Sequence, residues 1–207
     1  MTSKQGVKAA GSWREVQPTE HAPILAGARQ VFHEKGYHGA SVRDIAARAG
    51  VTVPALYYHY KNKQAMLVAV LELNMVAVLA RVERALDDAG DRPEKRMAHL
   101  VEAIVLHLTR EVGAMALDRE MRYLEPENRK HYVAMRKRLE VLLVEIIDKG
   151  TAEGVFHPVD SVDTARALLG MCQAITTWFD PHGPSSPEDM ARQYAKIALN
   201  AVGARTA

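Results

Sequence analysis

Apolar residues recur every three or four positions along most of the chain beyond Glu20, a spacing that places them on one face of an α-helix. The first such face holds Ile24, Ala28, Val31 and Phe32, and the run "EKG" at 34–36 supplies a glycine stop. No stretch shows a convincing strand pattern. The chain is therefore predicted to be all-α, with about nine helices.

Capping residues mark the ends of these helices. Ser41 and Asp44 form a capping box, and Gly50 ends the helix that they begin. Thr52 is placed to cap the next short helix, and Asn62 to cap a long one that runs to about residue 88. Further helices are expected at 94–112, 116–123, 127–152, 161–179 and 187–202.

The short helix after Gly50 has a well-defined outward face. Leu56 and Tyr60 are four residues apart, so both are expected to pack inward. The outward face then holds Pro54, Ala55 and Tyr58, with Tyr57 and His59 on its flanks. Small side chains at the start of such a helix allow close approach to the major groove, and hydroxyl or imidazole groups can reach phosphate oxygens. The arrangement predicts a helix-turn-helix.

Charge is divided unevenly along the chain. Residues 1–63 carry nine Lys or Arg against four Asp or Glu, a net charge of +5, whereas the remainder has a net charge of −3. A basic head indicates a polyanionic partner, although ordinary scatter of surface charge would look similar. We expect a flexible basic arm at 1–17, a DNA-binding domain at 18–63 and a larger domain at 64–207.

Several other classes of protein are disfavoured. Cys172 is the only cysteine, so neither an intramolecular disulfide nor a CxxC metal site is possible, and it is expected to be a core residue. No metal, cofactor or catalytic constellation is recognised, which argues against an all-α enzyme. The polar N-terminus lacks a signal peptide, and the apolar run at 65–80 is interrupted by Glu72 and Asn74. A cytoplasmic protein without membrane contact is expected.

The run ILAGARQVFHEKGYHGASVRDIAARAGVTVPALYYHYKNKQAMLVAVLE, residues 24–72, resembles the DNA-binding domain of TetR-family transcriptional regulators. Members of that family read a near-palindromic operator in double-stranded DNA as homodimers. The resemblance implies DNA-facing roles for Ser41, Arg43, Thr52, Pro54, Ala55, Tyr57, Tyr58, His59 and Lys63. The family often carries glycine or alanine where this chain has Pro54. A DNA-packaging protein without sequence preference is the rival interpretation.

The same resemblance implies that the larger domain binds a small-molecule effector and dimerises. Helices 161–179 and 187–202 carry broad apolar stripes that suit an interface between two copies of the chain, or the core of one copy. The candidate interface residues are Leu168, Cys172, Ile175, Phe179, Met190, Tyr194, Ile197, Ala198 and Ala201.

An effector pocket is expected among the long helices, although the same residues would also suit an ordinary core. The candidates are Met75, Leu79, Met97, Leu100, Ile104, His107, Arg119, Met121, Arg122, Tyr123, Tyr132, Met135, Met171 and Trp178.

Three further stretches of sequence resemble one subgroup of this family. They are DREMRYL at 118–124, GTAEGVFHP at 150–158 and TTWFDPHGPSSPEDMARQYAKIAL at 176–199. All three resemble TetR-type repressors of lipid and steroid catabolism that respond to acyl-coenzyme A thioesters. The resemblance implies that Arg119, Arg122 or Arg129 meets the coenzyme A phosphates. A drug-responsive regulator of efflux is the alternative within the family.

Overall fold

The computed structural model describes residues 12–15, 23–110 and 116–204, and within these ranges it contains eight α-helices, two short 3₁₀ helices and no strand. The elements are α1 (Pro23–Gly39), α2 (Val42–Ala49), α3 (Val53–His59), α4 (Lys63–Ala89), α5 (Pro93–Arg110), η1 (Ala116–Tyr123), α7 (Pro126–Ala152), α8 (Ser161–Ala174), η2 (Ile175–Thr177) and α9 (Pro187–Ala201). The all-α prediction is confirmed.

Two helices differ from their predicted form. Residues 116–123 make a 3₁₀ helix instead of an α-helix. The helix expected to run to residue 179 leaves α geometry after Ala174 and continues for three residues as η2. At the glycine stop, Gly36 takes a φ of 66°, outside the helical range, and interrupts α1 where predicted.

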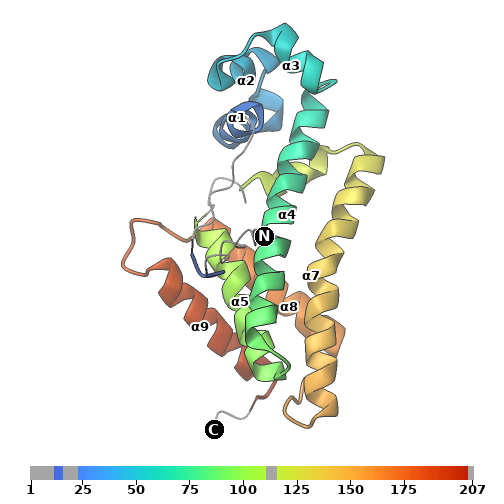
Figure 1. The fold of residues 1–207 in the computed structure, drawn as a ribbon, viewed down its shortest axis with the longest axis vertical. Helices are drawn as coiled ribbons and strands as arrows, with labels where there is room; N and C mark the ends of the chain where they lie inside the picture. The colour runs from blue at the N-terminus through green and yellow to red at the C-terminus, as the bar shows by residue number, and fades with distance from the viewer. Residues whose placement is uncertain (1–11, 16–22, 111–115, 205–207) are drawn as a thin grey trace, which may run out of the picture.

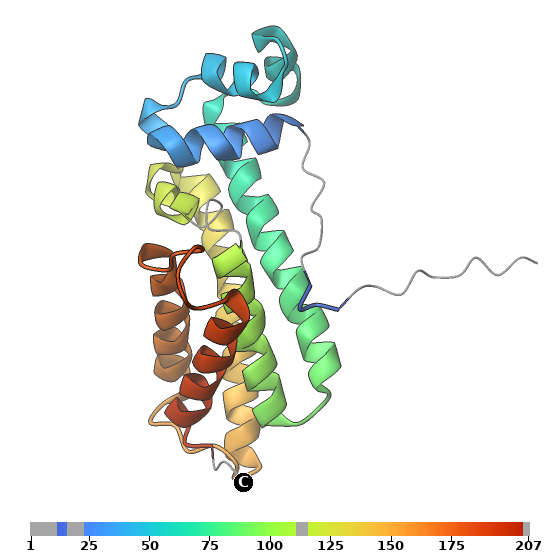
Figure 2. The ribbon, with the colours of Figure 1, turned by 90° about the vertical axis from the view of Figure 1, so that its left-hand side faces the viewer.

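Helices α1, α2 and α3 form a small head at one end of the molecule, and α4 leads from the head into the larger body (Figures 1 and 2). In the body, α5 packs against α4, α7, α8 and α9. Its residues 103–109 are all buried, so this helix is surrounded on every side. We call α1–α3 the head and the remaining helices the body.

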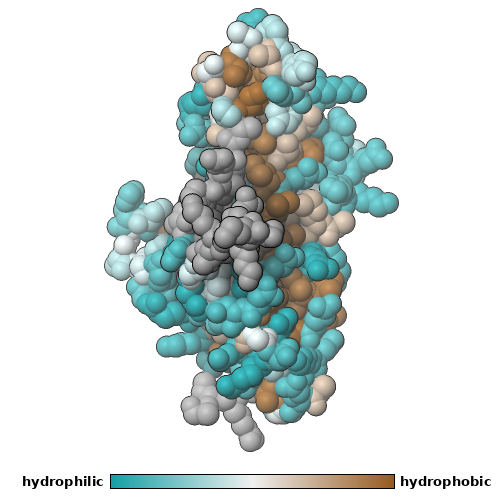
Figure 3. All heavy atoms as spheres, viewed as in Figure 1, coloured by the Kyte–Doolittle hydropathy of each residue, from teal (hydrophilic) through white to brown (hydrophobic). Residues whose placement is uncertain are grey.

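Helix α4 is long and apolar enough, by length and composition, to cross a membrane, which the shorter run at 65–80 did not indicate. Half of its most apolar 18-residue window is buried inside the protein, as in the core helix of a helical bundle. A band of apolar atoms runs along this face of the molecule (Figure 3). On α4, Val76 is 54% exposed. Burial therefore identifies α4 as a core helix.

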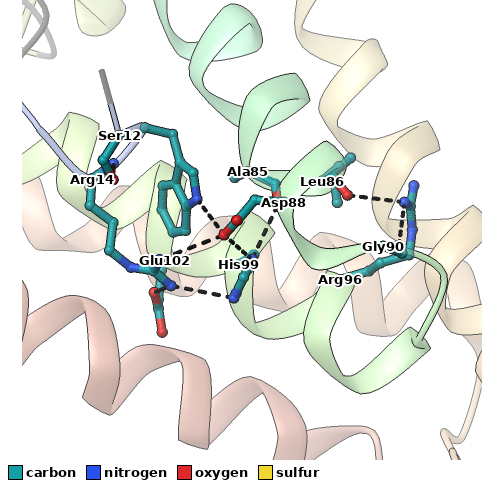
Figure 4. A network of polar contacts seen from close by, with 10 residues as sticks. Ser12, Arg14, Ala85, Leu86, Asp88, Gly90, Arg96, His99 and Glu102 are labelled. Atoms are coloured by element: carbon teal, nitrogen blue, oxygen red, sulfur yellow. Dashed lines mark hydrogen bonds and ion pairs between the residues drawn. The ribbon is translucent and has the colours of Figure 1, made fainter. Parts of the chain in front are cut away.

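Residues 12–15 of the predicted flexible arm are packed on the body. Trp13 is only 4% exposed, and its indole Nε1 donates to Asp88 at 3.0 Å. The buried Arg81 donates to the carbonyl oxygen of Trp13 at 2.7 Å. Arg14 donates to Glu102 on α5 at 3.0 Å (Figure 4). These four residues are therefore anchored near the far end of α4, and the rest of the 1–17 arm lies outside the described residues.

Replacing Trp13 by Ala is expected to lower the free energy of unfolding by about 3 kcal/mol, because it empties a buried aromatic site and leaves Asp88 without its indole donor. Urea denaturation checks this, with Tyr58→Ala as a control, since Tyr58 is 87% exposed and its loss should change stability by less than about 0.5 kcal/mol. Equal stabilities of the two variants would show that Trp13 is not an anchor.

Candidate nucleic-acid interface and internal cavity

The turn between α2 and α3 is fixed by side-chain caps. Ser41 accepts from the N–H of Asp44 at 3.1 Å, and Asp44 accepts from the N–H of Ser41 at 3.0 Å, which is the predicted capping box. Gly50 closes α2 in the left-handed conformation with φ 68°. Thr52 then accepts from the N–H of Ala55 at 3.3 Å and starts α3. This short turn sets the direction of α3.

The exposed face of α3 is the predicted one. Leu56 is completely buried and Tyr60 partly buried, so these two residues hold the helix against the head. Tyr58 is 87% and Tyr57 50% exposed. Pro54, Ala55 and His59 are also exposed, and the Tyr58 and His59 rings meet edge to face. Helix α3 therefore presents a small-residue start followed by hydroxyl and imidazole groups, with nothing from the described residues covering them.

The cations of the head fall into two groups. Arg48 makes two hydrogen bonds to Glu34 at 2.7 and 2.8 Å, and Lys35 pairs with Asp44 at 2.9 Å. The hydrogen bonds from Lys35 and Ser41 lower the pKa of Asp44 to about 2. Arg43, predicted to face DNA, is exposed and carries no ion pair within the described residues. Arg43 is therefore available for a phosphate, whereas Arg48 is neutralised.

Lys63, a predicted phosphate contact, points its ammonium group inward. Its Nζ donates to the carbonyl oxygens of Tyr37 at 2.7 Å and Ala40 at 2.8 Å, and it lies 4.4 Å from the centre of the Tyr37 ring. These carbonyls belong to the C-terminal end of α1, where a cation is favoured by the helix dipole. The side chain of Lys63 thus joins α4 to α1 and is not directed to solvent as a phosphate contact would require.

The short helix η1 lies between the head and the body. Glu120 on η1 accepts from the N–H of Tyr37 at 2.7 Å, and the Tyr123 ring stacks on that of Tyr37 at 5.9 Å. Gln64 on α4 donates to the carbonyl oxygen of Tyr123 at 3.0 Å. Met121, one residue after Glu120, lines a partly open cavity of the body. One short segment therefore contacts both the head and the cavity wall.

This cavity has a volume of about 420 Å³ and lies among α4, α5, η1, α7 and α8. Its size is that of a site for a small organic molecule. The lining residues are Asn74, Met75, Val78, Ile104, His107, Leu108, Met121, Val133, Arg136, Lys137, Leu139, Glu140, Arg166, Leu169, Gly170 and Gln173.

Four of the fourteen predicted pocket residues, Met75, Ile104, His107 and Met121, line this cavity. Met97, Leu100 and Tyr132 are instead buried core, and Leu79, Met135 and Met171 pack around that core. Tyr123 stacks on the head, Arg122 is exposed, Trp178 is 53% exposed, and the Arg119 side chain lies outside the described residues. Apolar stripes do not separate core from cavity, because both need the same side chains.

The charged residues of the cavity wall were not among the pocket residues predicted from the sequence. They are Arg136, Lys137 and Glu140 on α7 and Arg166 on α8, three cations against one carboxylate. The side chains of Lys137 and Arg166 are 54% and 59% exposed, both pair with Glu140, and Arg166 also pairs with Asp163 at 3.4 Å. Lys137 in particular lowers the pKa of Glu140 through a hydrogen bond. The exposed side of the cavity therefore carries net positive charge.

A neutral polar pair occupies the buried side of the cavity. His107 on α5 is 4% exposed and Asn74 on α4 is 9% exposed. Nε2 of His107 lies 2.9 Å from Oδ1 of Asn74. Burial, with a smaller contribution from Arg81, lowers the pKa of His107 to about 4, so the ring is neutral at pH 7.

The predicted interface residues fall into buried, partly buried and exposed groups within a single chain. Leu168, Cys172, Ile175, Met190 and Ala198 are at most 5% exposed within a single chain, so they belong to its core. Phe179 and Tyr194 are partly buried, whereas Ile197 and Ala201 are exposed. Cys172 is 1% exposed, which confirms the prediction of a core residue, and this burial raises the pKa of its thiol to about 12.

The outward face of α8 holds residues that the sequence did not single out. Ala167, Gly170 and Ala174 are exposed there, and Trp178 follows them. The other side of α8 packs on α5, α7 and α9, so the buried part of its apolar stripe belongs to the core of the same chain.

The depressed pKa of His107 should make stability depend on pH. Between about pH 6.5 and pH 4 the His107 ring is protonated in the unfolded chain and neutral in the folded chain. The free energy of unfolding therefore falls as the pH falls through this window. This group alone should contribute about 3 kcal/mol to that fall. Denaturant unfolding at pH 7.5, 5.5 and 4.5 should show a shallower fall for His107→Gln, and parallel profiles would contradict the assignment.

Comparisons with known proteins agree with both parts of the fold. Residues 24–70 match the profile described as "Bacterial regulatory proteins, tetR family", and residues 90–202 match "Tetracyclin repressor-like, C-terminal domain". The transcriptional repressor KstR2 of Mycolicibacterium smegmatis is 28% identical over 181 residues, which cover 86% of this chain and 88% of that protein.

Solved structures give the same result. A tetR-family regulatory protein from Rhodococcus RHA1 is 30% identical, with a TM-score of 0.82 over 89% of this chain and 97% of that one. AibR, solved in complex with isovaleryl coenzyme A and operator DNA, is 28% identical, with a TM-score of 0.75 over 88% and 97% of the two chains. The chain therefore belongs to the TetR family and is a DNA-binding transcriptional repressor, not an enzyme.

Proposed function

We propose that this repressor binds a near-palindromic operator as a homodimer and is released by a small anionic effector that enters the cavity, an acyl-coenzyme A thioester being the favoured class. The observation that carries the effector class is the cavity itself, which joins an apolar interior to a cationic rim.

On the DNA side, α3 enters the major groove with Pro54 and Ala55 nearest the bases, and Tyr57, Tyr58 and His59 reach the bases or backbone beside them. The exposure of all five side chains supports this placement. Phosphates meet the Arg43 guanidinium, the Thr52 hydroxyl group and, beside Ser41 and Lys63, the backbone N–H groups at the starts of α2 and α4. Lys63 contributes through that backbone group while its side chain holds α1.

The dimer forms through the outer faces of α8 and α9. The exposed small residues on α8, with Trp178 beside them and Ile197 and Ala201 on α9, allow two such helix pairs to meet closely about a two-fold axis. Operator half-sites lie one helical turn apart, so a two-fold dimer is what presents two copies of α3 to them.

The apolar lining takes the acyl part of the effector, and Arg136, Lys137 and Arg166 meet the phosphates of the coenzyme A part. These three cations replace Arg119, Arg122 and Arg129 in that role, because they line the cavity, whereas Arg122 and Arg129 are exposed away from its lining. The likeness to AibR, which was solved with isovaleryl coenzyme A, supports the same class.

A lipophilic drug is the alternative effector. The rim favours an anionic effector, because its three cations outnumber the paired carboxylates Glu140 and Asp163, and a net positive charge repels the positively charged amines common among such drugs.

Release of DNA follows from the position of η1. An effector that displaces Met121 moves the segment whose Glu120 and Tyr123 hold the head, and α4 transmits the same change through Gln64. The effector acts only to the extent that it binds the DNA-incompetent arrangement more tightly than the other.

The effector class can be tested on an operator selected from random DNA, with fluorescence anisotropy as the readout. Acyl-coenzyme A thioesters should release the operator at lower concentrations than coenzyme A or the free acid alone. Combining Lys137→Ala with Arg166→Ala should weaken the thioesters by about tenfold or more and the neutral methyl ester little. No release by any thioester would refute the effector class, and no enrichment of one DNA sequence would refute operator specificity.

Tyr58→Ala should weaken operator binding by about tenfold, because it removes a side chain that projects from α3 without supporting the fold. Tyr58→Phe removes only the hydroxyl group and so separates its contribution to affinity from that of the ring. Unchanged affinity in Tyr58→Ala would show that this face of α3 does not contact DNA.

Arg43→Ala should flatten the dependence of log affinity on log salt by about 0.9 for each operator half-site, because it deletes one phosphate contact. Lys63→Gln is the matched comparison. Its ammonium is bound to the Tyr37 and Ala40 carbonyls, so the variant should lower thermal stability while leaving the salt slope unchanged. A flattened slope in Lys63→Gln would restore Lys63 as a phosphate contact.

A further inference from the structure

Four residues on one side of α8 line the cavity. Arg166, Leu169, Gly170 and Gln173 follow the spacing i, i+3, i+4 and i+7, which places them on a single face of the helix. Gly170 is exposed, and it lies one turn from Arg166, whose side chain is 59% exposed at the rim. Gly170 therefore lies at the opening of the cavity, beside a cation.

The fold of a single chain does not require glycine at this position. Gly170 lies inside α8 and is not among the glycines with a positive φ. A Cβ added to it would meet no described atom within 4 Å apart from its chain neighbours and the adjoining helix backbone, whereas a Cβ on Gly150 would come within 2.1 Å of Phe156. Glycine inside a helix is less stable than alanine, because it loses more conformational freedom on folding. The chain thus keeps a residue that lowers helix stability and that its own packing does not need.

The proposed dimer does not by itself explain the glycine either. Ala167 and Ala174 are also exposed on the outward side of α8, and neither lines the cavity. Their methyl groups are small enough to let a helix of a second subunit come close. Of these three small residues, Gly170 is the one that borders the cavity, so the ligand is the better reason for its missing side chain.

We infer that Gly170 determines which effectors the cavity accepts, because the space beside its backbone holds the part of the ligand that joins an apolar body to an anionic headgroup. The inference rests on the proposed function, since it concerns the ligand of the same cavity. A buried charge would lack solvation, so the headgroup stays at the rim while the apolar body lies inside. The joining part must then cross the opening, where Gly170 leaves the backbone of α8 uncovered.

Selection at Gly170 acts on size. The charge of the rim comes from Arg166 and other cations that remain in place when Gly170 is replaced. A larger side chain at position 170 takes up space at the opening and leaves those cations unchanged. Loss of binding in such a variant therefore reports on space rather than on charge.

The test uses anilinonaphthalene sulfonate, which joins a bulky apolar body to an anion and becomes fluorescent when it leaves water. It is titrated into the full-length protein. Gly170→Leu should weaken its binding by about tenfold or more, because the added side chain occupies space that the probe needs. Gly170→Gln adds a polar side chain of similar size and should weaken binding to a similar extent. Since Gly170 is exposed, both variants are expected to fold, which thermal unfolding without the probe checks.

Two control variants separate the cavity from the helix and from the dimer. Ala174→Leu adds a similar volume on the outward side of α8 away from the cavity lining, so it should leave the dissociation constant within about twofold of the wild-type value. Gly170→Ala should raise the melting temperature by about 2 °C, because alanine favours a helix and meets no neighbour at this position.

Unchanged probe binding in either larger variant of Gly170 would overturn the inference. Equal weakening by Ala174→Leu, a lower melting temperature for Gly170→Ala, or absence of probe binding to the wild type would overturn it as well. These measurements use neither operator DNA nor a thioester. A repressor that thioesters release, and whose Gly170→Leu variant binds the probe normally, would retain the proposed function and lose only this inference.

Discussion

The continuity of α4 is the constraint on which the rest of the structure depends. A single helix of 27 residues, about 40 Å long, begins beside α3 in the head and ends in the body against Trp13. Asn62 caps its start, and Lys63 binds the end of α1, so the head is attached to the helix by charge-assisted hydrogen bonds as well as by packing. Any reorientation of α4 must carry the head with it.

Because α4 is long, a small change of its tilt in the body produces a large displacement of the head. A tilt of about 5° about the far end displaces the head by about 3.5 Å over this length. In the proposed dimer, two copies of α3 must match half-sites separated by about 34 Å, so a displacement of that size in each subunit would disturb both contacts together. The anchoring of Trp13 to Asp88 and Arg81 places a fixed point near the end of α4 that lies farthest from the head.

The sequence predicted the local features well and the long-range ones poorly. The capping box of Ser41, the left-handed Gly50 and the inward Leu56 follow from residues within one or two turns, so the face of α3 could be placed without tertiary information. The inward position of the Lys63 side chain could not be predicted, because its partners Tyr37 and Ala40 lie 26 and 23 residues earlier in the chain. The charged residues at the rim of the cavity were not predicted, for a related reason. Arg136 and Lys137 have the spacing of an ordinary solvated helix face, and only the approach of Arg166 from α8 makes them part of a site.

The placement of η1 explains how one cavity can influence a head that it does not touch. Glu120 and Tyr123 use polar and aromatic contacts to the head, and Met121 between them contributes a flexible apolar side chain to the cavity wall. A 3₁₀ helix has poorer hydrogen-bond geometry than an α-helix, so this segment is rearranged more readily than α4 or α5. Among the described residues, binding energy gained at Met121 would be opposed by the contacts that η1 makes with Tyr37, His38, Gln64 and Arg136. The proposed coupling between cavity and DNA is then limited by the strength of those contacts, a few kcal/mol at most, which is the range in which a ligand can shift a two-state equilibrium.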